Sequence, residues 1–200
     1  MRRTSKMASS IAHTNGHSIV GAEAFTSEPQ SARWQEYPFG LKAVGDKAFT
    51  EGINRMVIHR YAQQPHSDAA PAMTQGPWGI HFDRTNTLWK PSKAWLDYLN
   101  RSQTLLQKGK FVADFAYFIG ERVVGYTRVN NKDLQPSLMK GYDYDLINSE
   151  TLLRHASVKN SHLTLPDGMK YKVLVLQDQK AMSLELLRKL HSLIQEGLVV

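Results

Sequence analysis

Short apolar runs alternate with helix-like segments along this 200-residue chain, and the alternation restricts the possible folds more than any other feature. Two short apolar runs bounded by polar or glycine-containing segments, Ser18–Phe25 and Ile53–His59, are predicted to be buried strands. Helices are predicted at Met7–His13, Pro38–Glu51 and Ser92–Lys108, where apolar residues recur at helical spacing. Strands that alternate with helices are typical of a parallel sheet.

The second half of the chain repeats this alternation with more apolar strands. Phe111–Ile119 is continuously apolar, which is typical of a strand covered on both faces, and Lys170–Leu176 is a further buried strand. Tyr142–His155 indicates a strand or turn that leads into a short helix, and Leu198–Val200 begins another strand. Ser183–Glu196 is predicted to be an amphipathic helix. Its inward-facing residues are expected to be Leu186, Leu190, Leu193 and Ile194.

The order of these elements predicts two partial domains. A complete (β/α)₈ barrel needs ~250 residues, which is more than this chain offers. The first helix has no strand before it, and the last apolar segment stops inside a strand-like pattern. We therefore expect a piece of a longer protein, with one α/β domain in residues 1–110 and the start of another in residues 111–200.

Composition excludes several function classes. The chain has no cysteine, so disulfides, thiolate zinc sites and thiol nucleophiles are impossible. The net charge of +7 comes from scattered basic residues rather than one basic face, so we expect no nucleic-acid binding. No apolar run approaches the ~20 residues that span a bilayer, so no membrane partner is expected. The usual motifs of nucleotide binding, zinc proteolysis and serine hydrolysis are absent.

Glu23 is the first candidate for chemistry. It lies near the end of a predicted strand, between small residues and an aromatic one, where a carboxylate can act as acid, base or nucleophile. The alternative is a strand-end glutamate paired with a nearby arginine. Catalytic groups of barrels sit at the carboxyl ends of strands and on the loops that follow, and Glu23 and His59 occupy such positions.

The long loop Arg60–Lys90 offers candidates for ligand binding, since ordered loops of this length are usually functional. Aromatic rings mixed with charged, amide and imidazole groups suit a sugar, because the rings cover its apolar face and the polar groups bind its hydroxyls. His59 and His66 match no metal-ligand spacing, so no metal ligand is predicted. Trp95 is assigned to the core. The candidate sugar-binding residues are His59, Tyr61, Gln64, Trp78, His81, Asp83 and Arg84.

Several stretches of the chain together resemble glycoside hydrolase family 106, the α-L-rhamnosidases. The resemblance covers nearly the whole chain from about Ala8 onward. It is carried by GAEAFTS at Gly21–Ser27, WQEYPFGLKAVGDKAF at Trp34–Phe49, GINRMVIHRYAQQP at Gly52–Pro65, GPWGIHFDRTNTLW at Gly76–Trp89, YLNRSQTLLQKGKFVADFAYFIGE at Tyr98–Glu121, GYDYDLIN at Gly141–Asn148 and LPDGMKYKVLVL at Leu165–Leu176.

The resemblance implies an α/β fold: the last strands of a (β/α)₈ TIM barrel, followed by the start of a flavodoxin-like, glutamine-amidotransferase-like α/β domain. It implies inverting hydrolysis of terminal α-L-rhamnose from plant polysaccharide by two carboxylates, with a calcium ion in the parent enzyme. Glu23 lies in the stretch similar to a late barrel strand, so the role of base is carried onto it. The acid is expected outside this chain, and no calcium ligand is placed in it. The parent is expected outside the cytoplasm.

The chain departs from the family pattern inside the loop. HRYAQQPH at His59–His66 replaces the family's HRYAHQPW, and AMTQGPWG at Ala72–Gly79 replaces GMTMGPWG. These changes leave the sugar preference open. Two alternatives therefore stand beside the rhamnosidase: another barrel glycosidase of the β-galactosidase kind, and a non-catalytic carbohydrate-binding remnant.

Overall fold

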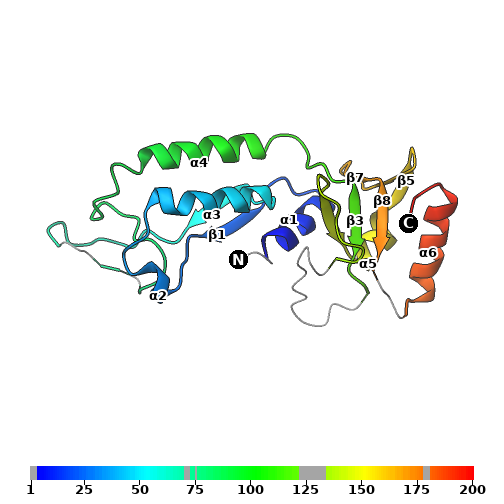
Figure 1. The fold of residues 1–200 in the computed structure, drawn as a ribbon, viewed down its shortest axis with the longest axis horizontal. Helices are drawn as coiled ribbons and strands as arrows, with labels where there is room; N and C mark the ends of the chain where they lie inside the picture. The colour runs from blue at the N-terminus through cyan, green and yellow to red at the C-terminus, as the bar shows by residue number, and fades with distance from the viewer. Residues whose placement is uncertain (1–3, 70–72, 75, 122–133, 178–180) are drawn as a thin grey trace. The chain divides into compact units, whose positions relative to one another are not determined.

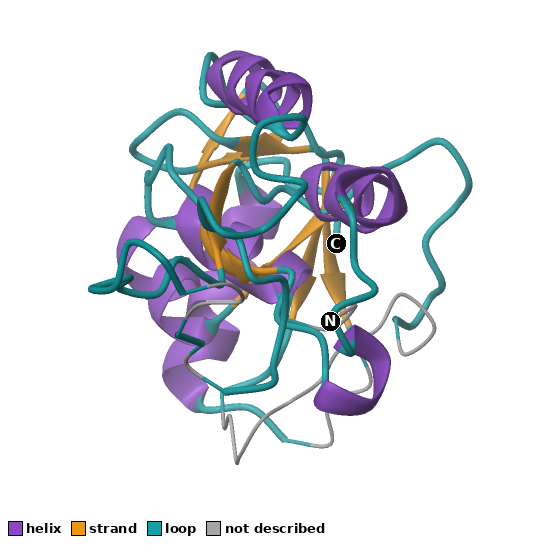
Figure 2. Cartoon of the chain, turned by 90° about the vertical axis from the view of Figure 1, so that its left-hand side faces the viewer, coloured by secondary structure: helices purple, strands orange, loops and turns teal. Residues whose placement is uncertain are grey.

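The computed structural model describes residues 4–69, 73–74, 76–121, 134–177 and 181–200 (Figure 1). Internal contacts divide the chain into two compact units, Ile19–Lys108 and Met1–Ser18 together with Gly109–Val200. Figure 2 shows helices and strands throughout the chain, joined by extended loops. Each unit is described by itself.

The unit of residues 19–108 is built on two parallel strands, β1 (Gly21–Ala24) and β2 (Arg55–Ile58). The short helix α2 (Pro29–Ala32) and the longer α3 (Pro38–Thr50) connect them, and α4 (Lys93–Leu106) ends the unit. The predicted strand–helix–strand order is therefore confirmed for this segment.

One face of the β1–β2 pair carries the core of this unit. Ala24 is buried, and its register partner Ile58 packs against the same cluster, which includes Trp95 and Leu99 from α4. Glu23 and its register partner Val57 point to the opposite face, because strand side chains alternate. Both are exposed there, so this face of the pair is open within the chain.

The loop after β2 folds back over the carboxyl ends of both strands. The Gly79 amide donates to the Ser27 carbonyl at 2.9 Å, which ties it to the segment after β1. The Arg60 amide donates to Ile80, and the Phe82 amide donates to Arg60, each at 3.1 Å. Ile80 and Phe82 complete the core from this side.

The other unit contains a parallel sheet in the order β4 (Tyr144–Ile147), β3 (Phe115–Phe118), β8 (Val173–Leu176). A small antiparallel sheet lies between β4 and β8 in the sequence. Its strands are β5 (Ser157–Lys159), β6 (His162–Thr164) and β7 (Lys170–Tyr171). Three helices complete this unit: α1 (Ser5–Thr14), α5 (Ser149–His155) and α6 (Leu184–Gln195).

Both faces of the parallel sheet are covered, as the apolar run at 111–119 predicts. Ala116 and Phe118 pack with buried leucines of α5 and α6. Tyr117, between them, packs on the opposite face with Leu134 and with Met7 of α1. The predicted extra strand at 198–200 is present as one parallel bridge between Val173 and Val199.

The structure differs from two sequence expectations. Helix α1 was expected with residues 1–110, but its contacts place it with residues 109–200. Ile194 of α6 was expected to face inward, and it is nearly half exposed. The identity of the two predicted domains stays a prediction. Among the described residues, the helices are too short or too polar to cross a membrane.

Candidate functional site

Glu23 lies on β1, one residue before the carboxyl end of the strand, with its side chain exposed. The Thr26 hydroxyl donates to Glu23 Oε1 at 2.6 Å, and this bond orients the carboxylate while the second oxygen stays available. The His59 amide donates to the Ala24 carbonyl at 3.1 Å. The two strand ends that the sequence singled out, at residues 23–24 and 59, are therefore adjacent.

Gly79 closes the space between these strand ends. A Cβ at this position would lie 2.7 Å from the His59 carbonyl oxygen and 2.9 Å from that of Phe25. Its φ of +71° is one that glycine adopts without strain. His59 Nδ1 is buried beside it and has no hydrogen-bond partner. The loop thus approaches the backbone of both strands as closely as a glycine permits.

The side chain of Arg60 fixes the loop segment at residues 76–78. Its guanidinium donates to the carbonyl oxygens of Gly76 at 2.7 Å and Trp78 at 3.2 Å. Burial lowers the pKa of Arg60, although a guanidinium stays protonated in proteins. Arg60 was not among the predicted site residues. In the sequence it only follows Ile58 and His59 at the end of a predicted strand, and no motif marks it.

His81 forms one wall of a pocket of about 230 Å³ between the loops that follow β1 and β2. Its buried ring stacks on Trp34, with ring centroids 3.7 Å apart. Burial, followed by the charge of Arg60, lowers the pKa of His81, so the imidazole is neutral near pH 7. The pocket is lined by Trp34, Glu36, Gly79, Ile80, His81, Thr85, Asn86, Thr87 and Leu88.

Glu36 faces this pocket with an incomplete set of partners. The Ser27 hydroxyl donates to Oε1, and Oε2 is buried without a hydrogen-bond partner. Neither Glu36 nor Trp34 was predicted as a site residue. A sequence signal for them was available. Trp34 and Glu36 lie in the segment after β1, and a position after a strand was the reason for choosing candidates in the loop after β2.

Asp83 and Gln64 mainly hold the loop together. Asp83 is buried, and it accepts bonds from the amide of Thr85 at 2.8 Å and from Gln64 Nε2 at 3.2 Å. Gln64 Nε2 also donates to the Met73 carbonyl, and Gln64 Oε1 is buried without a partner. The side-chain Nδ2 of Asn86 donates to the His81 carbonyl at 2.7 Å. These bonds fix the shape of the pocket wall.

The remaining predicted residues are exposed. Tyr61 is 57% exposed and its ring lies 6.1 Å from that of Trp89, while Trp78 is nearly half exposed. Arg84 is exposed and donates to the Gln64 carbonyl. Of the seven predicted binding residues, only His81 lines the pocket; Glu23 does not line it either. Their part in sugar binding stays a prediction, as does the role of Glu23.

No calcium ligand is assigned among the residues described here. Among them, no group of three histidine, aspartate or glutamate residues is close enough to hold a metal ion. The calcium ion implied by the family resemblance stays a prediction for the longer protein, and no step is derived through it.

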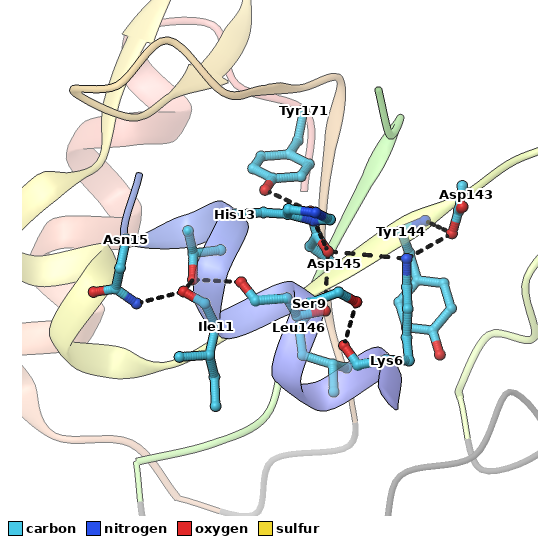
Figure 3. A network of polar contacts seen from close by, with 12 residues as sticks. Lys6, Ser9, Ile11, His13, Asn15, Asp143, Tyr144, Asp145, Leu146 and Tyr171 are labelled. Carbon is cyan, nitrogen blue, oxygen red and sulfur yellow. Dashed lines mark hydrogen bonds and ion pairs between the residues drawn. The ribbon is translucent and has the colours of Figure 1, made fainter. Parts of the chain in front are cut away.

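A second polar cluster lies in the other unit, around Asp145 of β4 (Figure 3). This fully buried carboxylate accepts bonds from Ser10 Oγ at 2.9 Å, His13 Nδ1 at 3.0 Å and the Tyr171 hydroxyl at 3.0 Å. Lys6 lies 3.9 Å away. The cluster joins α1 to the sheet, and both carboxylate oxygens of Asp145 already accept hydrogen bonds from other residues of this unit.

Comparison with known proteins gives matches that are all named as glycoside hydrolases. A family described as alpha-L-rhamnosidase, glycoside hydrolase family 106, matches residues 2–200. A protein of Formosa agariphila named putative beta-glucuronidase is 44% identical over 193 residues, which cover 96% of this chain. The solved structure of a rhamnosidase from Novosphingobium sp. PP1Y superposes with a TM-score of 0.86 at 33% identity over 98% of this chain.

The matched proteins are much longer. This chain spans 16% of the Formosa protein and 19% of the Novosphingobium rhamnosidase. Within that span, the likeness extends over both units, and it agrees with a mixed α/β fold with parallel sheets. The chain therefore belongs to glycoside hydrolase family 106, the alpha-L-rhamnosidase family.

Proposed function

We propose that this chain forms one side of the active site of an α-L-rhamnosidase, with Glu23 as the general base. In inverting hydrolysis the base takes a proton from water as the water attacks the anomeric carbon, and a separate acid protonates the leaving oxygen. The substrate class is terminal α-L-rhamnose on a plant oligosaccharide or glycoside. The acid belongs to a part of the longer protein that this chain does not contain.

The observation that carries the proposal is the placement of Glu23. Its carboxylate lies on the open face of the parallel β1–β2 pair, at the carboxyl end, oriented by Thr26. The loops after both strands meet directly beyond it, through Gly79 and Ser27. In (β/α)₈ barrels this end of the strands carries the catalytic groups.

The finer fold belongs to the same proposal. The β1–β2 pair, with α3 and α4 against one face, has the form of two β/α units of a barrel wall whose inner face carries Glu23. The β4–β3–β8 sheet, with helices on both faces, has the form of a flavodoxin-like domain. A calcium ion and an extracytoplasmic location remain proposals for the longer protein.

A second candidate function is hydrolysis of β-glucuronides. The observation that favours it is the name of the Formosa protein, which is 44% identical over nearly the whole chain. The two functions differ in the charge of the sugar, since rhamnose is neutral and glucuronate is an anion.

The test is a chimera in which this chain replaces the matching segment of the Novosphingobium rhamnosidase. Hydrolysis of an aryl α-L-rhamnoside is expected, and Glu23→Gln should lower kcat by ~10²–10⁴-fold, the usual contribution of a general base. Glu28→Gln, which removes an exposed carboxylate from the segment after β1, is the control. Undiminished turnover by the folded Glu23→Gln chimera would exclude this role.

The isolated chain supplies the complementary test. Because it lacks the acid, the purified chain should not hydrolyse rhamnosides. Turnover that Glu23→Gln abolishes would contradict the division of the two carboxylates between this chain and the rest of the enzyme.

A further inference from the structure

The pocket between the loops after β1 and β2 contains a carboxylate whose charge is poorly compensated. Glu36 has one hydrogen-bond donor, the Ser27 hydroxyl, and its Oε2 is shielded from water without a partner. A carboxylate that lines a pocket with no lysine or arginine in its lining makes the potential inside that pocket negative. Glu36 therefore sets the electrostatic character of the pocket.

The other lining residues do not offset this charge. Thr85, Asn86, Thr87 and Leu88 are uncharged. Among the described lining residues, His81 is the only other one that titrates, and burial keeps it neutral near pH 7. Arg60 is close enough to affect His81, but it does not line the pocket, and its guanidinium is engaged by the carbonyls of Gly76 and Trp78.

The shape and lining of the pocket suit a sugar ring. Its volume of about 230 Å³ accommodates a single pyranose, and Trp34 contributes an aromatic ring that is 56% exposed. Flat aromatic surface beside hydroxyl and amide groups is the chemistry that recognises saccharides. Glu23 does not line this pocket, so it is a separate subsite from the proposed catalytic base.

We propose that this pocket binds a neutral sugar unit of the substrate and that Glu36 excludes uronic acids from it. The ligand class rests on the proposed function as a carbohydrate-active enzyme. The selectivity follows from charge: a uronate carboxylate would enter beside an uncompensated carboxylate, and like charges placed together at a binding site cost several kcal/mol. Glu36 thus acts as a specificity-determining residue.

The test measures binding of two probes to the purified chain at pH 7, methyl α-L-rhamnopyranoside and methyl β-D-glucuronide, by ligand-observed NMR titration. Wild-type chain should bind the rhamnoside and bind the glucuronide at least about tenfold more weakly. Glu36→Gln keeps an acceptor for Ser27 and removes the charge. It should change rhamnoside affinity less than about threefold and raise glucuronide affinity by about tenfold or more.

Two control variants test whether the change in selectivity arises from Glu36 and from this pocket. Glu28→Gln removes an exposed negative charge from the segment after β1 and should leave the ratio of the two affinities unchanged. Thr87→Phe, which fills the pocket, should abolish binding of both probes. Circular dichroism confirms that each variant is folded, and the wild-type ratio tests the proposal even if a variant is not.

Three results would overturn the proposal: wild-type chain that binds neither probe, wild-type chain that binds the glucuronide as tightly as the rhamnoside, or a ratio that Glu36→Gln leaves unaltered. These failures are distinct from failure of the proposed function. Glu23→Gln should leave both affinities intact, because Glu23 lies outside the pocket, whereas turnover of the chimera depends on Glu23.

Discussion

The two units of this chain treat buried polar groups in opposite ways. Asp145, in the unit of residues 109–200, accepts hydrogen bonds from Ser10, His13 and Tyr171, and Lys6 lies nearby. In the described part of residues 19–108, one buried polar atom has no hydrogen-bond partner on each of Glu36, three residues of the loop after β2 and the core residue Trp95. Among the described residues, every buried side-chain nitrogen or oxygen without a partner lies in the latter unit.

The difference separates architecture from function. A satisfied buried network fixes one arrangement of its elements and has no capacity left for a ligand. Unpartnered buried atoms lower stability, by about 1–3 kcal/mol each, and persist where another molecule or chemistry uses them. This contrast supports the proposal that the loop region at the ends of β1 and β2 is the functional side of the chain, and it indicates a structural role for the Asp145 cluster.

The largest effect is expected at Asp145. Asp145→Ala removes the carboxylate shared by α1, β4 and β7 and leaves the buried donors of Ser10 and Tyr171 unpaired. Urea unfolding followed by circular dichroism should show a loss of about 3–5 kcal/mol in the free energy of unfolding. Asp143→Ala is the control, because Asp143 is 40% exposed and its ion pair with Lys6 should contribute at most about 1 kcal/mol. Equal losses in both variants would show that the cluster is not the anchor of α1.

A matched pair of glycines tests how tightly the functional loop is packed. Gly79→Ala places a methyl group within 3 Å of two carbonyl oxygens at a φ of +71°, so it should cost about 2–4 kcal/mol from strain and overpacking together. Gly109→Ala meets the same backbone strain at φ +79° but has no neighbour within 4 Å, so only about 1–2 kcal/mol is expected. Thermal and urea unfolding of the two variants measures the difference. Equal costs would mean that the loop does not rest on the strand ends.

Local periodicity was enough to predict most helices and strands. The segments at 38–51, 92–108 and 183–196 became α3, α4 and α6, and the continuous apolar run at 111–119 became the central strand β3. Long-range pairings were not predictable in this way. Ser10 and Asp145 are 135 residues apart, so nothing in the pattern of α1 indicates that it packs on β4.

The site residues divide in the same way into those that local sequence predicts and those that depend on long-range packing. Glu23 and His59 were found because a strand end is a local feature, and parallel pairing then placed the two ends together. Trp34 and Glu36 were missed because their role depends on the loop at 79–88 closing over them. The antiparallel strands β5 and β6 were also missed, since each has only three residues, and the single strand predicted at Lys170–Leu176 is divided into β7 and β8.

Tyr171 provides a smaller and pH-dependent test of the Asp145 network. Tyr171→Phe removes one of the hydrogen bonds to a buried carboxylate, and a loss of about 1.5–3 kcal/mol is expected in the free energy of unfolding at pH 7. Burial, and then the charge of Asp145, raises the pKa of Tyr171 above its ordinary value of 10.0. The unfolded chain therefore releases this proton first, and wild-type stability should hold below pH 10 and fall above it. Tyr171→Phe should show a shallower fall in the alkaline range; an identical slope would mean that this hydroxyl is not buried against Asp145.

The smallest effect is expected at His81, on the functional side. Burial lowers the pKa of His81 below its ordinary value of 6.5, so the unfolded chain binds this proton more readily than the folded one. The stability that the neutral imidazole provides is present above pH 6.5 and is lost as the pH falls towards the lowered pKa, by at most about 1.4 kcal/mol per pH unit. His81→Gln should flatten this acid limb without changing the alkaline one, measured by urea unfolding from pH 7.5 to pH 5. The same acid limb in wild type and variant would show that Trp34 and the loop at 79–88 do not bury the imidazole, and the pocket wall next to Glu36 would then be open to water.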